Sequence, residues 1–223
     1  MRCPDLEGFS PRPMVVVEDL WRRRPQMMKQ RLLAHLGHSR QVFARNCDIR
    51  RIDKPLAAAF LEASHSWGDA SCRFRYGMFT RRSTGGKEEK LPAGTLVAVS
   101  TFSSARNWVK DGSRIRSCEW TRYASLPGLR VVGGMGRMLN YFLEDTGVDD
   151  VMSYADLEWS DGEVYRELGF TEEGRREGVS FVIDRDSWER RPMSGAEVTA
   201  AGGSSCIYTN PGSLKFRLRV RQG

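Results

Sequence analysis

Three glycines at the start of an apolar, helix-like segment are the part of the sequence best suited to chemistry. A strand that enters a helix through glycines leaves several backbone N–H groups without partners, and the helix dipole adds partial positive charge there. Because such a turn favours phosphate oxygens, the segment predicts a diphosphate-bearing ligand, and a tight turn without any ligand is the alternative. The residues expected to bind it are Val132, Gly133, Gly134, Met135, Gly136 and Arg137.

Two polar residues follow this segment at positions where they can act on a substrate. Asp156 ends the apolar run "DVMSYAD", which predicts a buried strand, and ligands often bind beyond the carboxyl ends of strands. As a base, Asp156 needs a pKa raised by burial; alternatively it caps the following turn. Tyr165 lies on the next predicted helix and can protonate a leaving thiolate, or it can be an ordinary core tyrosine beside Val164 and Leu168.

A histidine and an arginine complete the set of candidate catalytic residues. His65 lies in the last turn of a helix expected to end at Gly68, where the dipole stabilises an imidazolium. It is a candidate base, a phosphate contact or a cap. Arg122 lies in a strand expected to be covered, and a covered arginine needs an anionic partner. Asp156 on the neighbouring strand is the expected partner, in a structural salt bridge or in a substrate clamp.

The elements that position these residues follow from apolar periodicity and turn signals. Strands alternate first with helices, then form a hairpin, and finally make a strand–helix–strand crossover, which predicts an α/β fold with a mixed sheet and helices on both faces. We expect an N-terminal strand–helix appendage over residues 1–46 and the main domain over 47–223. The expected strands are 14–17, 47–53, 73–82, 95–104, 117–126, 150–156, 179–186 and 214–220, and the expected helices are 18–37, 54–67 and 136–147.

The composition is that of an ordinary globular protein with an excess of arginine. The 223 residues carry a formal charge of +7, and no apolar run approaches the length of a membrane span. The excess charge indicates a solvated surface or a phosphate-rich partner, either a coenzyme or nucleic acid. The N-terminal residues lack a secretory pattern, and the five cysteines are scattered, so we expect the cytoplasm and no metal site.

The order of these elements resembles the GNAT N-acetyltransferase fold. The GNAT signature is Gln/Arg-x-x-Gly-x-Gly/Ala, which binds the pyrophosphate of acetyl-CoA; here the loop is "RVVGGMG", and Arg130 lies one place early. The segment "GEVYRELGF" resembles the GNAT helix whose tyrosine lies near the thioester sulfur. The resemblance implies a mixed, mostly antiparallel sheet with a splayed parallel strand pair, and acetyl-CoA or a related acyl-CoA as cosubstrate.

A narrower resemblance is to a Mom-like, GNAT-related group found in phages, one member of which modifies adenine in DNA. It rests on the segments "FLEASHSWG", "CEWTRYASL", "VVGGMGRML", "SYADLEWSDGEVYRELGF" and "IYTNPGSLKF". The N-terminal part also resembles the joint between a phage endonuclease domain and such a unit. The group's histidine, arginine, aspartate and tyrosine correspond to His65, Arg122, Asp156 and Tyr165.

Three hypotheses follow from the sequence. The first is a GNAT-fold acyltransferase that modifies an amino group with a coenzyme A thioester, the amine belonging to a nucleobase, a protein or a small molecule. The second is a Mom-like nucleic-acid-modifying enzyme with a different donor. The third is a non-catalytic nucleic-acid-binding relative. The sequence sets neither the acceptor nor the oligomeric state.

Overall fold

The structure is a computed structural model, which describes residues 9, 13–84, 90–110, 112–193 and 204–220. The chain forms two compact units. Unit 1 comprises Met1–Pro25 and Ser153–Leu218, and unit 2 comprises Gln26–Met152 and Arg219–Gly223. The boundary between the units falls between Met152 and Ser153, inside a strand. The appendage expected over residues 1–46 stays a prediction.

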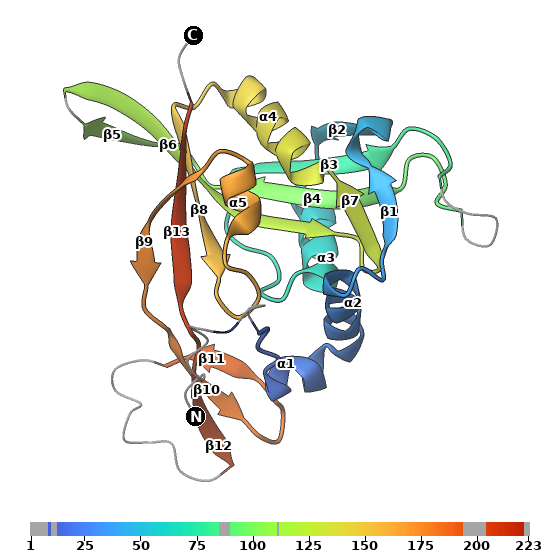
Figure 1. Cartoon of the computed structure of the whole chain (residues 1–223), viewed down its shortest axis with the longest axis vertical. Helices are drawn as coiled ribbons and strands as arrows, with labels where there is room; N and C mark the ends of the chain where they lie inside the picture. Colours follow the sequence, from blue (N-terminus) through green and yellow to red (C-terminus); the bar gives the residue numbers. More distant parts are fainter. Residues whose placement is uncertain (1–8, 10–12, 85–89, 111, 194–203, 221–223) are drawn as a thin grey trace. The chain divides into compact units, whose positions relative to one another are not determined.

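Unit 2 contains the mixed, mostly antiparallel sheet that the sequence predicts (Figure 1). Neighbouring strands in the order β2-β3-β4-β6 are antiparallel, and β5 forms a hairpin with the start of β6. The parallel pair is β6 with β8, in register from Ser117↔Asp150 to Glu119↔Met152. The strands are β2 (Cys47–Arg51), β3 (Phe74–Thr80), β4 (Leu96–Phe102), β5 (Arg106–Lys110), β6 (Ser113–Ser125) and β8 (Asp150–Asp156).

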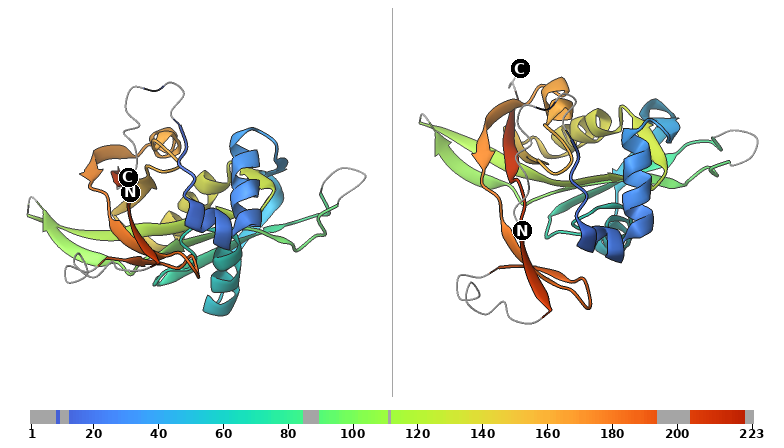
Figure 2. Two further views of the ribbon diagram at one scale, coloured as in Figure 1. Left: turned by 90° about the horizontal axis from the view of Figure 1, so that it is seen from below. Right: turned by 60° about the horizontal axis from the view of Figure 1, so that its bottom comes forward.

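Helices cover both faces of the sheet in unit 2: α3 (Lys54–Ser64) lies on one face and α4 (Gly134–Thr146) on the other (Figure 2). On the first face Phe60 and Leu61 pack in one core cluster with Val99. On the second face the ring of Phe142 stacks on that of Phe102, 3.7 Å between centroids. Because β4 contributes to both faces, it is almost continuously buried, as expected for a strand covered on two sides.

The N-terminal elements differ from the prediction in two ways. The expected helix over 18–37 is two helices, α1 (Glu18–Arg23) and α2 (Pro25–His35), because Pro25 disfavours helical backbone in the residue before it. The strand expected at 14–17 is wrong: within the described chain this segment makes no ladder, and Val15 N–H donates a single backbone hydrogen bond to the carbonyl of Glu158 at 2.8 Å.

A small parallel sheet precedes the glycine turn. It pairs β1 (Arg40–Phe43) with β7 (Leu129–Val132), and a short helix, η1 (Ala44–Asn46), connects β1 to β2. The strand that enters the glycines is therefore the four-residue β7, and the predicted strand over 117–126 belongs to the longer β6, which ends at Ser125. The prediction of one strand before the glycines is therefore replaced by two strands, β6 and β7.

Unit 1 contains the end of β8 and two groups of strands. Strand β13 (Ser213–Arg219) lies between β8 and β9 (Thr171–Arg176), and the short helix α5 (Glu163–Glu167) precedes β9. A separate sheet has the order β11-β10-β12. Its strands are β10 (Ser180–Asp184), β11 (Arg190–Pro192) and β12 (Ser205–Thr209). All six residues of β9 are exposed, so no apolar alternation marks that strand in the sequence.

Candidate active site

The glycine turn forms the N-terminus of α4, as predicted. Gly133 is the N-cap and has φ 72°, a left-handed conformation that favours glycine. The first-turn amides of Gly134, Met135 and Gly136 precede the first helical hydrogen bond, which Arg137 N–H donates to the carbonyl of Gly133 at 3.1 Å. Glycine has no side chain to cap these amides. They therefore provide donors and dipole for an anion.

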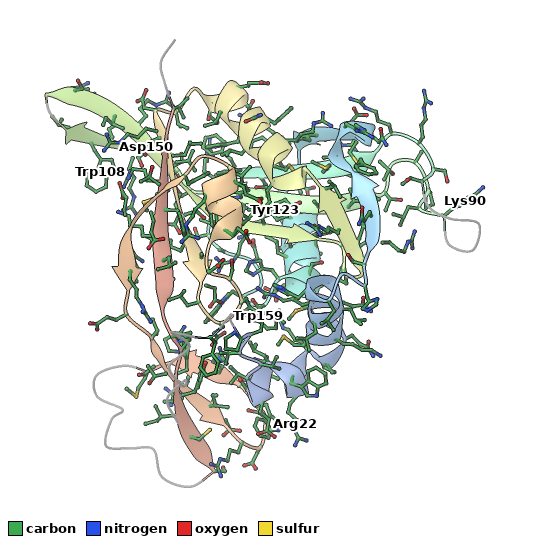
Figure 3. All side chains as sticks on the ribbon, in the orientation of Figure 1. Arg22, Lys90, Trp108, Tyr123, Asp150 and Trp159 are labelled. Atoms are coloured by element: carbon green, nitrogen blue, oxygen red, sulfur yellow. The ribbon has the colours of Figure 1, made fainter. Side chains whose placement is uncertain are left out.

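Tyr123 of β6 packs against this turn from inside the unit (Figure 3). A Cβ added to Gly134 would collide with the Tyr123 hydroxyl and approach Cγ1 of Val131 at 3.0 Å. Gly134 is thus glycine because of close packing, in addition to any role in ligand binding. Burial raises the pKa of Tyr123 to about 12, so its phenol stays protonated at neutral pH.

The Arg137 side chain forms hydrogen bonds with the protein's own backbone rather than extending to the exposed side of the glycine turn. Its Nη1 donates to the carbonyl of Ala44 and, at 3.1 Å, to that of Cys47. These carbonyls flank η1, so Arg137 ties the start of α4 to the corner between β1 and β2. Val132, also expected to bind the ligand, pairs with Phe43 in the β1–β7 ladder.

A cavity of about 390 Å³ lies in unit 2 between α2, the end of α3 and the β6–β7 turn. Tyr123 lines this cavity and also contacts Gly134, so the cavity and the glycine turn share one side chain as a wall. The volume suits a small-molecule site. The polar side chains lining it are Gln30, Arg31, His35, Ser64, His65, Tyr123, Ser125 and Arg130.

His65 lines the cavity, but its geometry favours a donor over a base. Helix α3 ends at Ser64, so His65 is the C-cap residue rather than part of the last turn. Its Nδ1 accepts a hydrogen bond from Trp67 N–H at 3.1 Å. In the neutral imidazole that bond places the proton on Nε2, which then donates. His65 can therefore stabilise an oxyanion more readily than it can remove a proton.

Arg122 is half-buried and bonds backbone carbonyls in unit 2. Its Nε donates to the carbonyl of Gly68 at 3.2 Å, and its Nη1 donates to that of Thr121 at 2.8 Å. The bond to Gly68 holds the loop that follows His65 against β6. Asp156, the partner expected from the sequence, belongs to unit 1.

Asp156 ends β8 as predicted and has the capping geometry given above as its alternative role. Its Oδ1 accepts a hydrogen bond from Glu158 N–H at 3.0 Å. Its backbone carbonyl accepts from the N–H groups of Trp159 and Ser160, both at 3.0 Å. These bonds fix the tight turn that follows the strand.

Tyr165 is on α5, and its ring belongs to the core of unit 1. It stacks on Phe216 at 5.2 Å and meets Phe170 edge-on at 5.5 Å between centroids. Its hydroxyl oxygen accepts a hydrogen bond from Ser153 Oγ at 2.9 Å. Burial raises the pKa of Tyr165, so the side chain is a phenol at neutral pH and has a proton that it can donate.

Unit 1 also contains buried ionisable groups that the sequence analysis did not find. Glu158 is 1% exposed and accepts a hydrogen bond from the Tyr208 hydroxyl at 2.8 Å. Burial and the nearby charge of Asp156 raise the pKa of Glu158 to about 7. Asp19 accepts two hydrogen bonds from Arg190 at 2.7 and 2.8 Å, and both side chains are buried. Only the tertiary fold brings these residues together, so local patterns give no signal for them.

Two further features bear on the predicted partners. In the described part of the chain no helix is both long and apolar enough to cross a membrane. Among the same residues no group of three or more histidine, cysteine, aspartate or glutamate side chains is placed to bind a metal ion.

Comparison with known proteins gave matches among solved structures only: neither a protein-family model nor a curated protein matches the sequence. An acetyltransferase of Bacillus subtilis in complex with CoA is 10% identical over 79% of this chain and 99% of that chain, with a TM-score of 0.43. NAA60 of Arabidopsis thaliana, in complex with a bisubstrate analogue, is 9% identical over 78% and 99% of the two chains, with a TM-score of 0.46. Eis1 of Mycobacterium abscessus is 19% identical over 63% of this chain and 34% of its own, with a TM-score of 0.41.

Proposed function

We propose that this protein is a GNAT-type acyltransferase that moves an acyl group from acetyl-CoA, or a related coenzyme A thioester, to an amine. The glycine turn at the N-terminus of α4 is the observation that carries the proposal. It offers consecutive first-turn amides at Gly134, Met135 and Gly136 at the positive end of a 13-residue helix. The turn also contains the Gly-x-Gly part of the GNAT motif, as Gly134 and Gly136, although Arg130 lies one place early.

The donor in this proposal is bound mainly by backbone groups. The amides of Gly134, Met135 and Gly136 hold the diphosphate, whereas the Arg137 side chain stabilises the start of α4 through the carbonyls of Ala44 and Cys47. Coenzyme A supplies the activated thioester. The protein then needs to orient the amine, keep it neutral and stabilise the charge that develops on the thioester oxygen.

The transfer itself requires one bond to form and one to break. The amine nitrogen attacks the thioester carbon, the C–S bond breaks, the nitrogen loses a proton and the thiolate gains one. His65, with its proton on Nε2, is the proposed donor to the developing oxyanion. For the unit 1 residues we propose that Tyr165 protonates the thiolate and Asp156 accepts the proton of the amine, and each role is tested singly.

The test is release of free coenzyme A thiol from acetyl-CoA in the presence of amines, including adenine nucleosides, peptides and small amines. We expect amine-dependent release, which falls at least tenfold in kcat for Tyr165→Phe and for Asp156→Asn, whereas Tyr141→Phe is the matched control and keeps wild-type kcat. Mass spectrometry of the product identifies the acylated nitrogen. Absence of any thiol release with all amines, by protein that binds acetyl-CoA, would count against catalysis of acyl transfer.

A further inference from the structure

Two arginines are among the residues that line the cavity of unit 2. Arg31 of α2 and Arg130 of β7 come from elements far apart in the sequence and line the same space, together with His35 and His65. No carboxylate is among the residues that line it, all of which belong to the described part of the chain. Arginine binds phosphate and carboxylate in a bidentate manner, so two arginines lining one cavity favour an anionic ligand.

Arg31 is held in place before any ligand arrives. Its Nη1 donates a hydrogen bond to Ser66 Oγ at 2.9 Å, and Ser66 is buried two residues after the end of α3. That bond links α2 to the segment containing His65. A guanidinium fixed in this way loses less side-chain freedom when it binds an anion than a free surface arginine does.

A second ionisable side chain of α2, His35, lines the cavity together with Arg31. Partial burial and the positive charge of Arg31 both lower the pKa of His35. An anion bound in the cavity has the opposite effect on His35, which gives a second readout of occupancy.

The rest of the cavity wall sets the size of the ligand. Apolar side chains of Met27, Ala34, Ala124 and Leu129 cover the surface between the polar groups. A volume of about 390 Å³ with this lining suits a short molecule that has one charged end and a small apolar body.

From these observations we propose that the cavity binds an anionic group, a phosphate or a carboxylate, carried by the amine that is acylated. The anion lies between Arg31 and Arg130, and Tyr123 separates it from the glycine turn. The identity of the ligand as the acceptor rests on the proposed acyltransferase function; the binding of an anion does not. The diphosphate of coenzyme A is bound by the amides of residues 134–136. The acceptor's anion and coenzyme A are therefore held by different hydrogen-bonding groups.

The first experiment measures binding of inorganic phosphate and of acetate by calorimetry to wild-type protein and to three variants. Arg130 is exposed, so Arg130→Gln should fold normally, and Arg31→Gln tests the buried side of the cavity. Arg73→Gln changes an exposed arginine of unit 2 outside the cavity and is the matched control. We expect binding of at least one of the two anions to weaken tenfold or more in Arg130→Gln and Arg31→Gln, and to stay unchanged in Arg73→Gln.

Repeating the anion titration in saturating coenzyme A shows whether the cavity receives the acceptor or coenzyme A itself. If the cavity receives the acceptor, the anion still binds when coenzyme A is present, and the affinity for coenzyme A is the same in Arg130→Gln as in wild type. If coenzyme A displaces the anion and itself binds tenfold more weakly to Arg130→Gln, the cavity belongs to the donor and the proposal is overturned. It is equally overturned if neither anion binds wild-type protein, or if both bind the Arg130→Gln and Arg31→Gln variants as well as wild type.

The second experiment uses acyl transfer to compare ethanolamine, O-phosphoethanolamine and β-alanine. An anionic acceptor should have a KM at least tenfold below that of ethanolamine, and Arg130→Gln should abolish that advantage with little change in kcat. Equal KM values for all three amines would reject the acceptor assignment. Anion binding without any acyl transfer would instead retain the anion site and refute the proposed enzymatic function, so the two failures are distinguishable.

Discussion

The Tyr123 hydroxyl occupies the space that a side chain at Gly134 would need. The contact connects the long strand β6 to the first residue of α4. It explains why the glycine turn tolerates no Cβ on its inner side, whereas a Cβ at Gly133 would meet only Ala44 Cβ, at 4.0 Å. Gly134 is required for close packing, and Gly133 is required for its left-handed backbone conformation.

This relationship predicts the behaviour of Gly134→Ala. The added methyl group must displace the hydroxyl end of the half-buried Tyr123 ring, so we expect the free energy of unfolding in urea to fall by about 1–3 kcal/mol. Tyr123→Phe removes the colliding oxygen, so the double variant should recover part of that loss. Asn140→Ala, at an exposed position of α4, is the control and should be nearly neutral. Additive effects of the two substitutions would show that the contact is not the cause.

Arg137 should matter for stability rather than for ligand affinity. Its hydrogen bonds to the carbonyls of Ala44 and Cys47 join α4 to the η1 corner. Arg137→Ala should therefore lower the free energy of unfolding by roughly 1.5–3 kcal/mol, the range for bonds with a charged donor. The folded variant should bind coenzyme A like wild type, and Arg82→Ala, an exposed arginine in the same unit, should change neither quantity. Unchanged stability with lost coenzyme A binding is the opposite pattern and would restore the direct role first expected for Arg137.

Glu158 should make stability depend on pH. Its pKa in the folded protein is about 7, against an ordinary value of 4.5, because of burial and the charge of Asp156. Between these two values the native state binds more protons than the unfolded state, so stability falls as pH rises from 4.5 to about 7. The contribution is on the order of 3 kcal/mol. Glu158→Gln should flatten this dependence in urea titrations at several pH values, and Glu163→Gln, an exposed change on α5, should leave it as in wild type. An identical slope in wild type and Glu158→Gln would contradict the assignment.

The buried pair of Asp19 and Arg190 predicts a strongly asymmetric double-mutant cycle. Asp19→Leu leaves the buried Arg190 guanidinium without the Asp19 carboxylate, so we expect a loss of about 3–5 kcal/mol in the free energy of unfolding. Replacing both residues, as Asp19→Leu with Arg190→Met, should cost less than the single change, because no charge is then left buried alone. The cycle is measured by thermal and urea unfolding. A double variant that loses the sum of the two single losses would show that the residues do not interact.

The sequence predicted the elements whose signals are local. The N-cap Asp53 indicates the start of α3, and its side chain accepts a hydrogen bond from Leu56 N–H at 3.0 Å. The apolar spacing of Met138, Leu139 and Phe142 identified the buried side of α4. Strand β9 could not be found in this way, because an exposed edge strand of charged residues has no alternation to read. The helix break at Pro25 was available in the sequence and shows that a helical pattern on both sides of a proline can represent two helices.

The candidate site was predictable only in part, because residue type gives a side chain's chemistry but not its partners. Spacing placed the glycine turn at the start of α4 and His65 at the end of α3. It could not show that Arg137 bonds backbone carbonyls, because those carbonyls lie some 90 positions earlier in the chain. Nor could it bring Arg31 and Arg130 to one cavity, since they come from α2 and β7. Such pairings depend on long-range packing, for which a single sequence contains no direct signal.

The most direct test of the central claim is calorimetric titration of coenzyme A into wild type, Met135→Pro and Met135→Leu. Proline is tolerated in the first turn of a helix and removes one amide donor, whereas leucine keeps the donor and has a similar volume. If the amides at the start of α4 bind the diphosphate, Met135→Leu should bind coenzyme A like wild type, and Met135→Pro should bind at least tenfold more weakly while unfolding at the same urea concentration. Equal affinity in both variants, or no binding to wild-type protein, would contradict the account.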